Sequence, residues 1–244
     1  MQISTRGLIE IMSHEGICLE PYLDSVGVWT IGVGQTKSDD IDPKTMGKIT
    51  LQQAIDLFKR KIKQYTNAVD ALGLHLTQYQ YDALTSLCYN FGQGNLRKLC
   101  NGRSLDEIGE AIMLYTKPPE ITERRKKEQR LFKTGQYSNT DGMVLVFPVK
   151  NNHPRYREGY KLDAMPYFSG AAITHTKIPL PKPQPPKPAT STATKVGTGA
   201  VVAGTAGTIA IGVQQGWGVT PWLIAAGLAA GISFVVYLIR KADR

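Results

Sequence analysis

Three polar side chains near the N-terminus have types and spacing suited to the cleavage of a glycosidic bond. Glu15 and Asp24 are separated by eight residues, and Thr30 follows Asp24 after five more. That reaction requires a carboxylic acid to protonate the leaving oxygen and a second polar or anionic group to handle water or the cationic sugar ring. Two acids at such a distance occur in many proteins, so the surrounding sequence must decide whether they form a site.

The surrounding sequence carries a recognisable signature. The pattern Glu-x8-Asp-x5-Thr lies within EG…PYLDSVGVWTIGVGQT, and two later segments read LTQYQYDALTSLCYNFG and ITERRKKEQRLFKTGQY. Together they resemble the phage lysozymes, glycoside hydrolase family 24, over about residues 3–137. The resemblance implies hydrolysis of the β-1,4 bond between N-acetylmuramic acid and N-acetylglucosamine in peptidoglycan, with no cofactor and no metal.

The resemblance also implies a role for each residue of the pattern. Glu15 is the expected general acid, Asp24 the base or electrostatic partner, and Thr30 the group that orients the attacking water. Arg124 aligns with a family arginine that pairs with the acid. The alternative for Arg124 is a solvated basic helix face shared with its neighbours in RRKK.

Three further residues near the pattern leave alternatives open. Tyr22 could position the substrate by stacking on a sugar, although packing within a hairpin explains it equally well. Gln35 stands where the family commonly has histidine, which puts a structural hydrogen bond or ion pair in doubt but no catalytic step. Cys18 lies between the two carboxylates and could close the cleft through a disulfide after export, or be a buried, inert thiol.

Helix-start signals locate the elements that must hold these groups. Capping boxes begin at Thr50, Thr77 and Ser104, each followed three residues later by Gln or Glu. Apolar residues then recur with helical periodicity, and Gly73 and Gly92 are the expected ends of the first two helices.

Two more helices and one small sheet complete the expected catalytic part. Helices are predicted over residues 4–14 and 122–133, the second ending before Gly135. Residues 26–34 combine β-branched and aromatic side chains with glycines and predict a β-hairpin. The predicted fold class is α+β, lysozyme-like and mostly helical with a small N-terminal sheet, to which a C-terminal membrane helix or helical hairpin is added.

Composition limits the partners. The chain has 244 residues and a net charge of +9, which favours a polyanion: a cell wall, an anionic membrane or nucleic acid. No nucleic-acid-binding motif is present, so we expect peptidoglycan and the bacterial inner membrane as partners. Three cysteines without metal-site spacing, and an N-terminus unlike a secretory signal, predict synthesis in the host cytoplasm.

The composition of the chain changes after about residue 175, up to which it looks like an ordinary soluble domain. We expect a lysozyme catalytic domain at 1–142, an accessory extension without an assigned role at 143–175, a Pro/Lys-rich linker at 176–195 and membrane segments at 196–244. The linker has six prolines and four lysines, and residues 196–239 contain no charge. Two 18-residue segments, 196–213 and 222–239, are just long enough to span a thin bilayer.

The number of spans decides the topology, and the sequence leaves it open. Two spans would put both ends in the cytoplasm, whereas one span at 222–239 would put the enzyme outside. We expect association with the host inner membrane through this tail and action on the periplasmic cell wall during host lysis, with a holin or other lysis proteins as candidate partners. The alternatives are a virion-associated lysozyme used in entry, and a holin-like membrane-permeabilising tail with a wall-docking domain.

Overall fold

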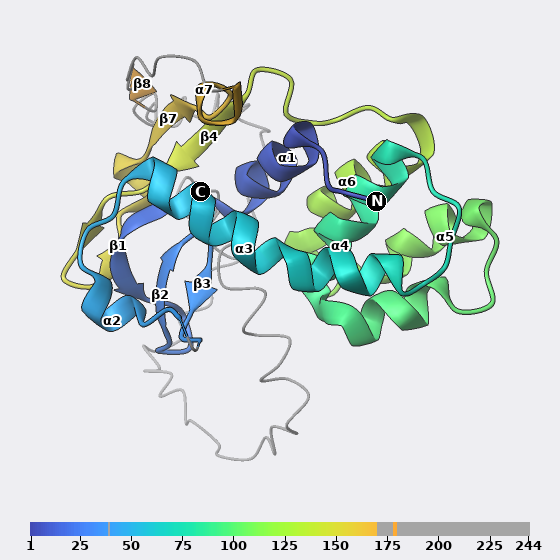
Figure 1. The fold of residues 1–244 in the computed structure, drawn as a ribbon, viewed down its shortest axis with the longest axis horizontal. Coiled ribbons are helices and arrows are strands. Elements are labelled where there is room, and N and C mark those ends of the chain that lie inside the picture. Colours follow the sequence, from blue (N-terminus) through green and yellow to red (C-terminus); the bar gives the residue numbers. More distant parts are fainter. Residues whose placement is uncertain (39, 170–177, 180–244) are drawn as a thin grey trace, which may run out of the picture.

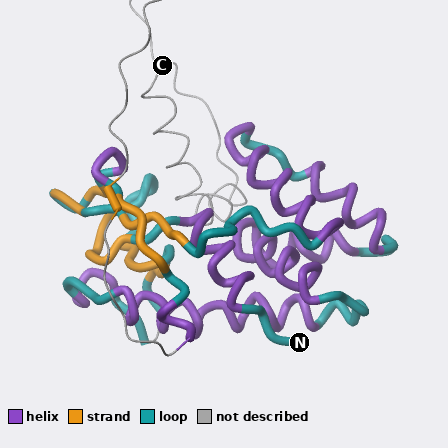
Figure 2. The backbone as a smooth tube through the Cα atoms, turned by 90° about the horizontal axis from the view of Figure 1, so that it is seen from above, coloured by secondary structure: helices purple, strands orange, loops and turns teal. Residues whose placement is uncertain are grey.

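The computed structural model describes residues 1–38, 40–169 and 178–179. Strands gather at one end of the molecule and most helices at the other, as Figure 2 shows from above. Helix α3 (Leu51–Asp70) runs between the two lobes (Figure 1). Its first half packs into the core around the strands, through residues such as Ile55 and Phe58, and Val69 near its end packs into the core of the helical lobe.

The helical lobe is built by elements whose starts the capping boxes locate. It comprises α4 (Gln78–Cys100), α5 (Leu105–Ala111), the short turns η1 (Ile112–Leu114) and η2 (Pro119–Ile121), and α6 (Thr122–Thr134). All three predicted capping boxes form, at Thr50, Thr77 and Ser104. Gly92 interrupts α4 with a non-helical φ of 85°; two helices meet there across a kink, so the first of them ends at the predicted glycine.

Helix α1 (Thr5–Glu15) lies between the lobes and begins at the N-cap Ser4, close to its predicted start. Asp82 of α4 accepts hydrogen bonds from the backbone N–H of Ser4 at 3.1 Å and from the Tyr137 hydroxyl at 2.6 Å. A Cβ at Gly7 would lie 2.5 Å from the Asp82 carboxyl carbon, so only glycine lets α1 come this close. These contacts hold the start of α1 against the helical lobe.

The N-terminal sheet differs from the predicted hairpin. It has three antiparallel strands in the order β1 (Cys18–Leu23), β2 (Trp29–Gly32) and β3 (Gln35–Thr36), followed by the short helix α2 (Pro43–Met46). The predicted hairpin over 26–34 contains β2, but its first residues are wrong, because 26–28 form the turn between β1 and β2. Strand β1 was not predicted, and it contains Pro21, a residue that argues against a strand in a sequence. The register of β1 and β2 shifts between Cys18 and Tyr22, and an irregularity of this kind tolerates proline.

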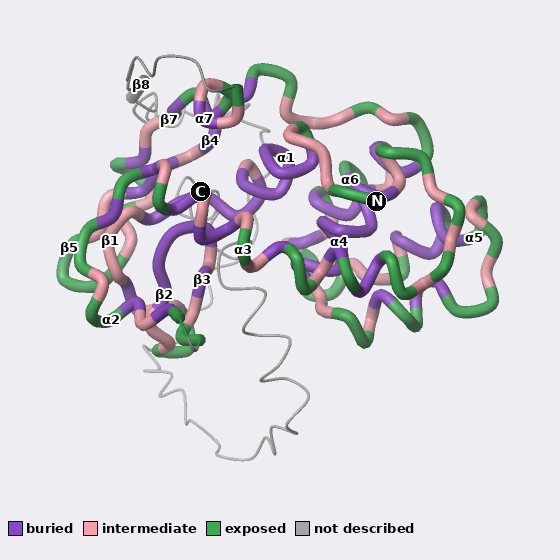
Figure 3. The backbone as a smooth tube through the Cα atoms, in the orientation of Figure 1, coloured by how far each residue is buried: buried purple, intermediate pink, exposed green. Residues whose placement is uncertain are grey.

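Residues 143–169 form a second set of strands packed on the first. They comprise β4 (Met143–Val146), β5 (Val149–Lys150), β6 (His153–Pro154), η3 (Tyr156–Glu158), β7 (Tyr160–Asp163) and α7 (Pro166–Ser169), and β8 (Ile178–Pro179) pairs with β7. Val144, Val146 and Leu162 enter the same core as α1 and β2. In Figure 3, β4 lies beside α1 and alternates between intermediate and buried residues, whereas its partner β7 has one buried residue, Leu162, between exposed ones. The segment therefore packs on the catalytic part.

The expected membrane segments at 196–213 and 222–239 lie outside the described residues, as does most of the expected linker. Within residues 1–38, 40–169 and 178–179, no helix combines the length and the apolar character needed to cross a bilayer.

Glu10 lies in α1, five residues before the end of the helix. Its contribution to the free energy of unfolding can be measured through its pH dependence. Glu10 is 1% exposed and accepts backbone hydrogen bonds from Ser138 at 3.1 Å and Asn139 at 2.8 Å. Burial raises its pKa, but the hydrogen bond and charge of His14 and the contacts of Ser138 and Asn139 lower it to about 2. The carboxylate thus joins α1 to the chain leaving α6.

We predict that Glu10 contributes on the order of 3 kcal/mol of stability at neutral pH. Its folded pKa lies below the unfolded value of 4.5, so this contribution is complete above about pH 5 and is lost as the pH falls towards 2. Glu10→Gln should therefore lower the free energy of unfolding at pH 7 and flatten its pH dependence between 5 and 2, measured by denaturant titration. The control Glu110→Gln removes an exposed partner of Lys133 and should change stability by less than about 1 kcal/mol; equal effects of the two variants contradict the assignment.

Candidate active site

Glu15 is the last residue of α1 and is 3% exposed. The chain then turns at Gly16, whose φ is 72°, and enters β1 at Cys18. Arg124 of α6 donates from Nη1 to Glu15 Oε1 at 2.6 Å. The carboxyl group thus has a defined orientation at the junction of the two lobes.

Arg124 is itself held by a buried polar network from α4 and α6. Its Nε donates to Glu128 Oε1 at 2.9 Å, and the Ser86 hydroxyl donates to the same oxygen at 2.6 Å. Arg125 completes the network by donating to Glu128 Oε2 and to Asn90 Oδ1. Burial raises the pKa of Glu128, but the charges of Arg125 and Arg124 outweigh it and hold that pKa low. Glu128 therefore offsets one of the two buried guanidinium charges, and Glu15 faces the other.

The pairing of Arg124 with the acid is thus present in the structure. The alternative of a solvated helix face is wrong for Arg124 and Arg125, which are 6% and 1% exposed, and describes only Lys126 and Lys127. Sequence reasoning did not find Ser86, Asn90 or Glu128, a set of polar residues that are all buried in the network. The spacing of Glu128 from the two arginines, four and three residues, was the available signal for an intrahelical pair.

Asp24 follows β1 directly and builds the turn to β2. Its Oδ1 accepts hydrogen bonds from the backbone N–H groups of Val26 at 2.9 Å and Val28 at 2.8 Å. Gly27, with a φ of 80°, donates its N–H to the Asp24 carbonyl at 3.1 Å. Among the described residues, Asp24 Oδ2 accepts no hydrogen bond, so one oxygen is fixed by the turn and the other is left for a ligand.

Thr30 lies in β2 opposite Tyr22 of β1 and is 3% exposed. Its hydroxyl donates to the carbonyl of Val28 at 3.1 Å. Because the hydroxyl proton is used within the turn, the oxygen is left to accept a hydrogen bond from another molecule. That geometry suits a group that orients water.

Tyr22 lies between the two carboxylates. Burial raises the pKa of its phenol, and the negative charges of Asp24 and Glu15 raise it further. Glu15 and Asp24 are therefore both within electrostatic range of one side chain. At 2% exposure the ring packs against Cys18 and Phe147 and has little surface for stacking on a sugar.

Gln35, which stands where the family commonly has histidine, forms hydrogen bonds through both atoms of its amide group. Its Oε1 accepts from the backbone N–H of Val33 at 2.7 Å, and its Nε2 donates to the carbonyl of Val33 at 3.2 Å and to the Tyr89 hydroxyl at 3.4 Å. The amide thus binds both backbone groups of the glycine-rich turn after β2. The structural hydrogen bond that the substitution put in doubt is supplied by the amide.

Cys18 is buried against Tyr22, and burial together with the charge of Glu20 raises the pKa of its thiol well above the ordinary value. A thiol of this kind is a poor nucleophile and a poor partner for disulfide exchange. The structure therefore favours the inert reading of Cys18.

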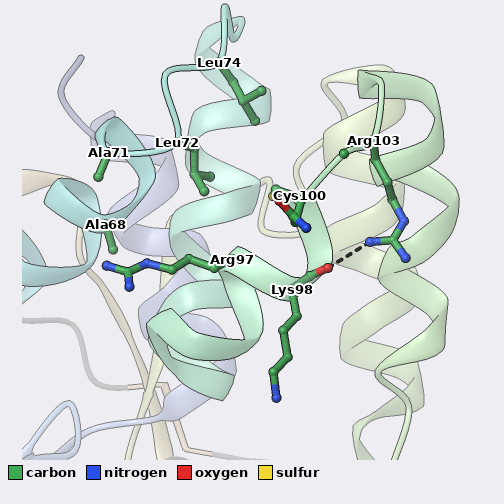
Figure 4. Close-up of a pocket in the computed structure, with 10 residues that line it drawn as sticks. Ala68, Ala71, Leu72, Leu74, Arg97, Lys98, Cys100 and Arg103 are labelled. Atoms are coloured by element: carbon green, nitrogen blue, oxygen red, sulfur yellow. Dashed lines mark hydrogen bonds between the residues drawn. The ribbon is translucent and has the colours of Figure 1, made fainter.

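Two other features of the described residues lie apart from this site. Within residues 1–38, 40–169 and 178–179, no group of three or more His, Cys, Asp or Glu side chains could hold a metal ion. A pocket of about 690 Å³ lies between the ends of α3 and α4, where Figure 4 shows the Arg103 guanidinium directed at the carbonyl of Lys98, at 2.8 Å. None of the groups predicted for catalysis lines this pocket.

Known proteins share this arrangement. The family model "Phage lysozyme" matches residues 12–128, which include Glu15, Asp24, Thr30 and Arg124. The endolysin of Salmonella phage P22 is 35% identical over 144 residues, 54% of this chain and 98% of that protein. A SAR-endolysin of Haemophilus phage HP1 is 35% identical over 98 residues, 39% of this chain and 50% of that protein.

A solved structure agrees with these matches. The endolysin of Escherichia coli O157:H7 phage FAHEc1 superimposes with a TM-score of 0.53 at 30% identity, covering 57% of this chain and 98% of that structure. The matched part is the N-terminal region that carries the Glu15–Arg124 pair and the turn of Asp24. The chain belongs to the phage lysozyme family and is a glycoside hydrolase, an endolysin that acts on the bacterial cell wall.

Proposed function

We propose that this endolysin, as a member of glycoside hydrolase family 24, hydrolyses the β-1,4 bond between N-acetylmuramic acid and N-acetylglucosamine during host lysis. The observation that carries the proposal is the buried Glu15 held by Arg124 at 2.6 Å, beside a turn that leaves one oxygen of Asp24 for the substrate. Glu15 protonates the glycosidic oxygen as the bond breaks, and Asp24 stabilises the positive charge that develops on the sugar ring.

Thr30 completes the reaction in this proposal. Its oxygen accepts a hydrogen bond from the attacking water while its own hydroxyl donates to the Val28 carbonyl, which fixes the direction from which water approaches. Asp24 takes up one proton of this water as it attacks, and the other proton remains on the new hydroxyl of the anomeric carbon. An attack on the opposite face from the leaving group favours inversion at the anomeric carbon.

We further propose that the C-terminal tail tethers the enzyme to the inner membrane and that the enzyme acts in the periplasm. The support is the absence of charge over residues 196–239, the cationic residues Arg240 and Lys241 that follow, and the similarity to SAR-endolysins. The glycine-rich segment 196–213 is only weakly hydrophobic, which favours reversible insertion and release of the enzyme upon depolarisation. In this view 1–142 is the catalytic domain, 143–175 an extension and 176–195 a linker.

Glu15→Gln should lower the rate at which a cell-wall suspension loses turbidity by at least a hundredfold, because the amide cannot donate the proton. Its melting temperature should change little or rise, because the amide oxygen still accepts from Arg124 and catalytic carboxylates are commonly strained, although Glu128 then offsets only one of the two buried guanidinium charges. The matched control is Glu110→Gln, which changes an exposed carboxylate of α5 in the helical lobe and should leave activity and the free energy of unfolding nearly unchanged. Activity that survives in the Glu15 variant would exclude Glu15 as the acid.

The products distinguish hydrolysis from the alternative lytic reaction. Mass spectrometry of murein digested by the full-length protein should show reducing muramic acid ends, each heavier by one water than the anhydro ends of a transglycosylase. Predominantly anhydro ends would contradict the role assigned to Thr30.

Membrane release can be followed by fractionation. Before treatment with an uncoupler the full-length protein should sediment with the inner membrane, and afterwards a large share should be found in the soluble periplasmic fraction. Retention in the membrane pellet under both conditions would contradict release, and a soluble protein under both conditions would contradict the tether.

A further inference from the structure

The hairpin of residues 147–158 is an addition to the catalytic part, because the family model ends at residue 128. Strands β5 and β6 pair at Lys150 with His153, and the two residues between them, Asn151 and Asn152, have φ values of 54° and 62°. Two consecutive positive φ angles are typical of the type I′ turn, which holds a two-residue hairpin tightly. The hairpin is thus a defined structural unit.

This hairpin is attached to the edge of β1 beside the catalytic carboxylates. The carbonyl of Asn152 accepts a hydrogen bond at 2.8 Å from the N–H of Leu23, the residue before Asp24. At the other end of β1, Ile17 donates to Leu145 at 2.9 Å and accepts from Phe147 at 2.8 Å. Figure 3 shows β5 beside β1, as these bonds require. The tip of the hairpin therefore lies next to the turn that presents Asp24.

The inner side of the hairpin is fixed by aromatic packing. The rings of Tyr156 and Phe147 meet edge to face with their centroids 5.3 Å apart, in the cluster that contains Cys18 and Tyr22. Burial raises the pKa of the Tyr156 phenol, and the negative charge of Asp24 raises it further. Tyr156 thus lies within electrostatic range of Asp24, and the hairpin cannot move freely relative to it.

The outer side of the hairpin is basic. Lys150, Arg155 and Arg157 are exposed and Glu158 is the one acidic residue of the segment, so three positive charges less one negative charge leave an excess of two. Arg155 and Arg157 flank Tyr156 on either side. An arginine guanidinium can bind a carboxylate with two parallel hydrogen bonds, so such a surface is suited to the carboxylates of peptides.

We propose that the 147–158 hairpin is a substrate subsite in which Arg155 and Arg157 bind carboxylates of the peptide side chains of a peptidoglycan strand. The inference rests on the proposed function, because the sugar linkage of that strand must lie at Glu15 and Asp24 for the hairpin to meet its peptides. The hairpin then directs the enzyme to peptide-bearing strands and adds binding energy without taking part in bond cleavage.

The test compares two substrates with one double variant of the full-length protein. Arg155→Ala/Arg157→Ala should lose about tenfold in kcat/KM on intact peptidoglycan, mainly through KM, because charge-assisted hydrogen bonds to the peptides are removed. On glycan strands stripped of their peptides by an amidase, the same variant should match the unmodified protein. An equal loss on both substrates, or no loss on either, overturns the proposal.

The matched control removes two exposed positive charges in the helical lobe. Arg97→Ala/Lys98→Ala, at the end of α4 (Figure 4), should retain activity on both substrates. A loss on intact peptidoglycan equal to that of the hairpin variant would mean general charge attraction and overturn the proposal. Glu15→Gln loses activity on both substrates, so failure of the hairpin and failure of the proposed function are distinguished.

A stability measurement guards against misfolding of the hairpin variant. Its melting temperature should match that of the unmodified protein, and if it does not, the single variant Arg155→Ala is compared on the two substrates instead. A selective loss of several-fold on intact peptidoglycan supports the subsite, and its absence in a folded single variant overturns it.

Discussion

The contact on which the site depends is the ion pair between Glu15 and Arg124. It joins the end of the first helix to a helix 109 residues later and is buried on both sides. A buried pair of this kind is stable only if the remaining hydrogen-bonding groups of both partners are satisfied. Glu128, Ser86, Arg125 and Asn90 satisfy them, so residues that never touch substrate determine where the catalytic carboxyl points.

The second constraint is the outer edge of β1. An unpaired edge strand offers hydrogen-bonding groups to any other strand, and this one also presents Asp24. Here the extension covers it, with Leu145 and Phe147 bonded to Ile17 and Asn152 bonded to Leu23. The same contacts bury Tyr22 and Cys18, so the segment that protects the edge also decides that these two side chains are structural and brings a basic hairpin to the catalytic turn.

Local signals in the sequence were sufficient for most elements but not for the sheet. The capping boxes and the glycine stops depend on groups within one helical turn, so Thr50, Thr77, Ser104 and Gly135 could be interpreted without tertiary knowledge. Strand β1 could not, because Pro21 is tolerated only where the register shifts. Residues 26–28 have β-forming side chains, yet the hydrogen bonds of Asp24 and the positive φ of Gly27 make them a turn.

By itself the sequence determined the chemistry: the identities and spacing of Glu15, Asp24 and Thr30, the family, and the helices that capping and periodicity define. These are properties of neighbouring residues along the chain, where a side chain and the backbone it caps are a few bonds apart. Tertiary structure alone decided that Glu128 balances Arg125, that Tyr22 is covered, and that the 147–158 hairpin lies beside Asp24. It also decided between the two interpretations of Arg124 that the sequence left open, in favour of the pair with Glu15. Each of these depends on burial and on partners distant in the chain, because charge pairing and exclusion of water are set by packing rather than by spacing.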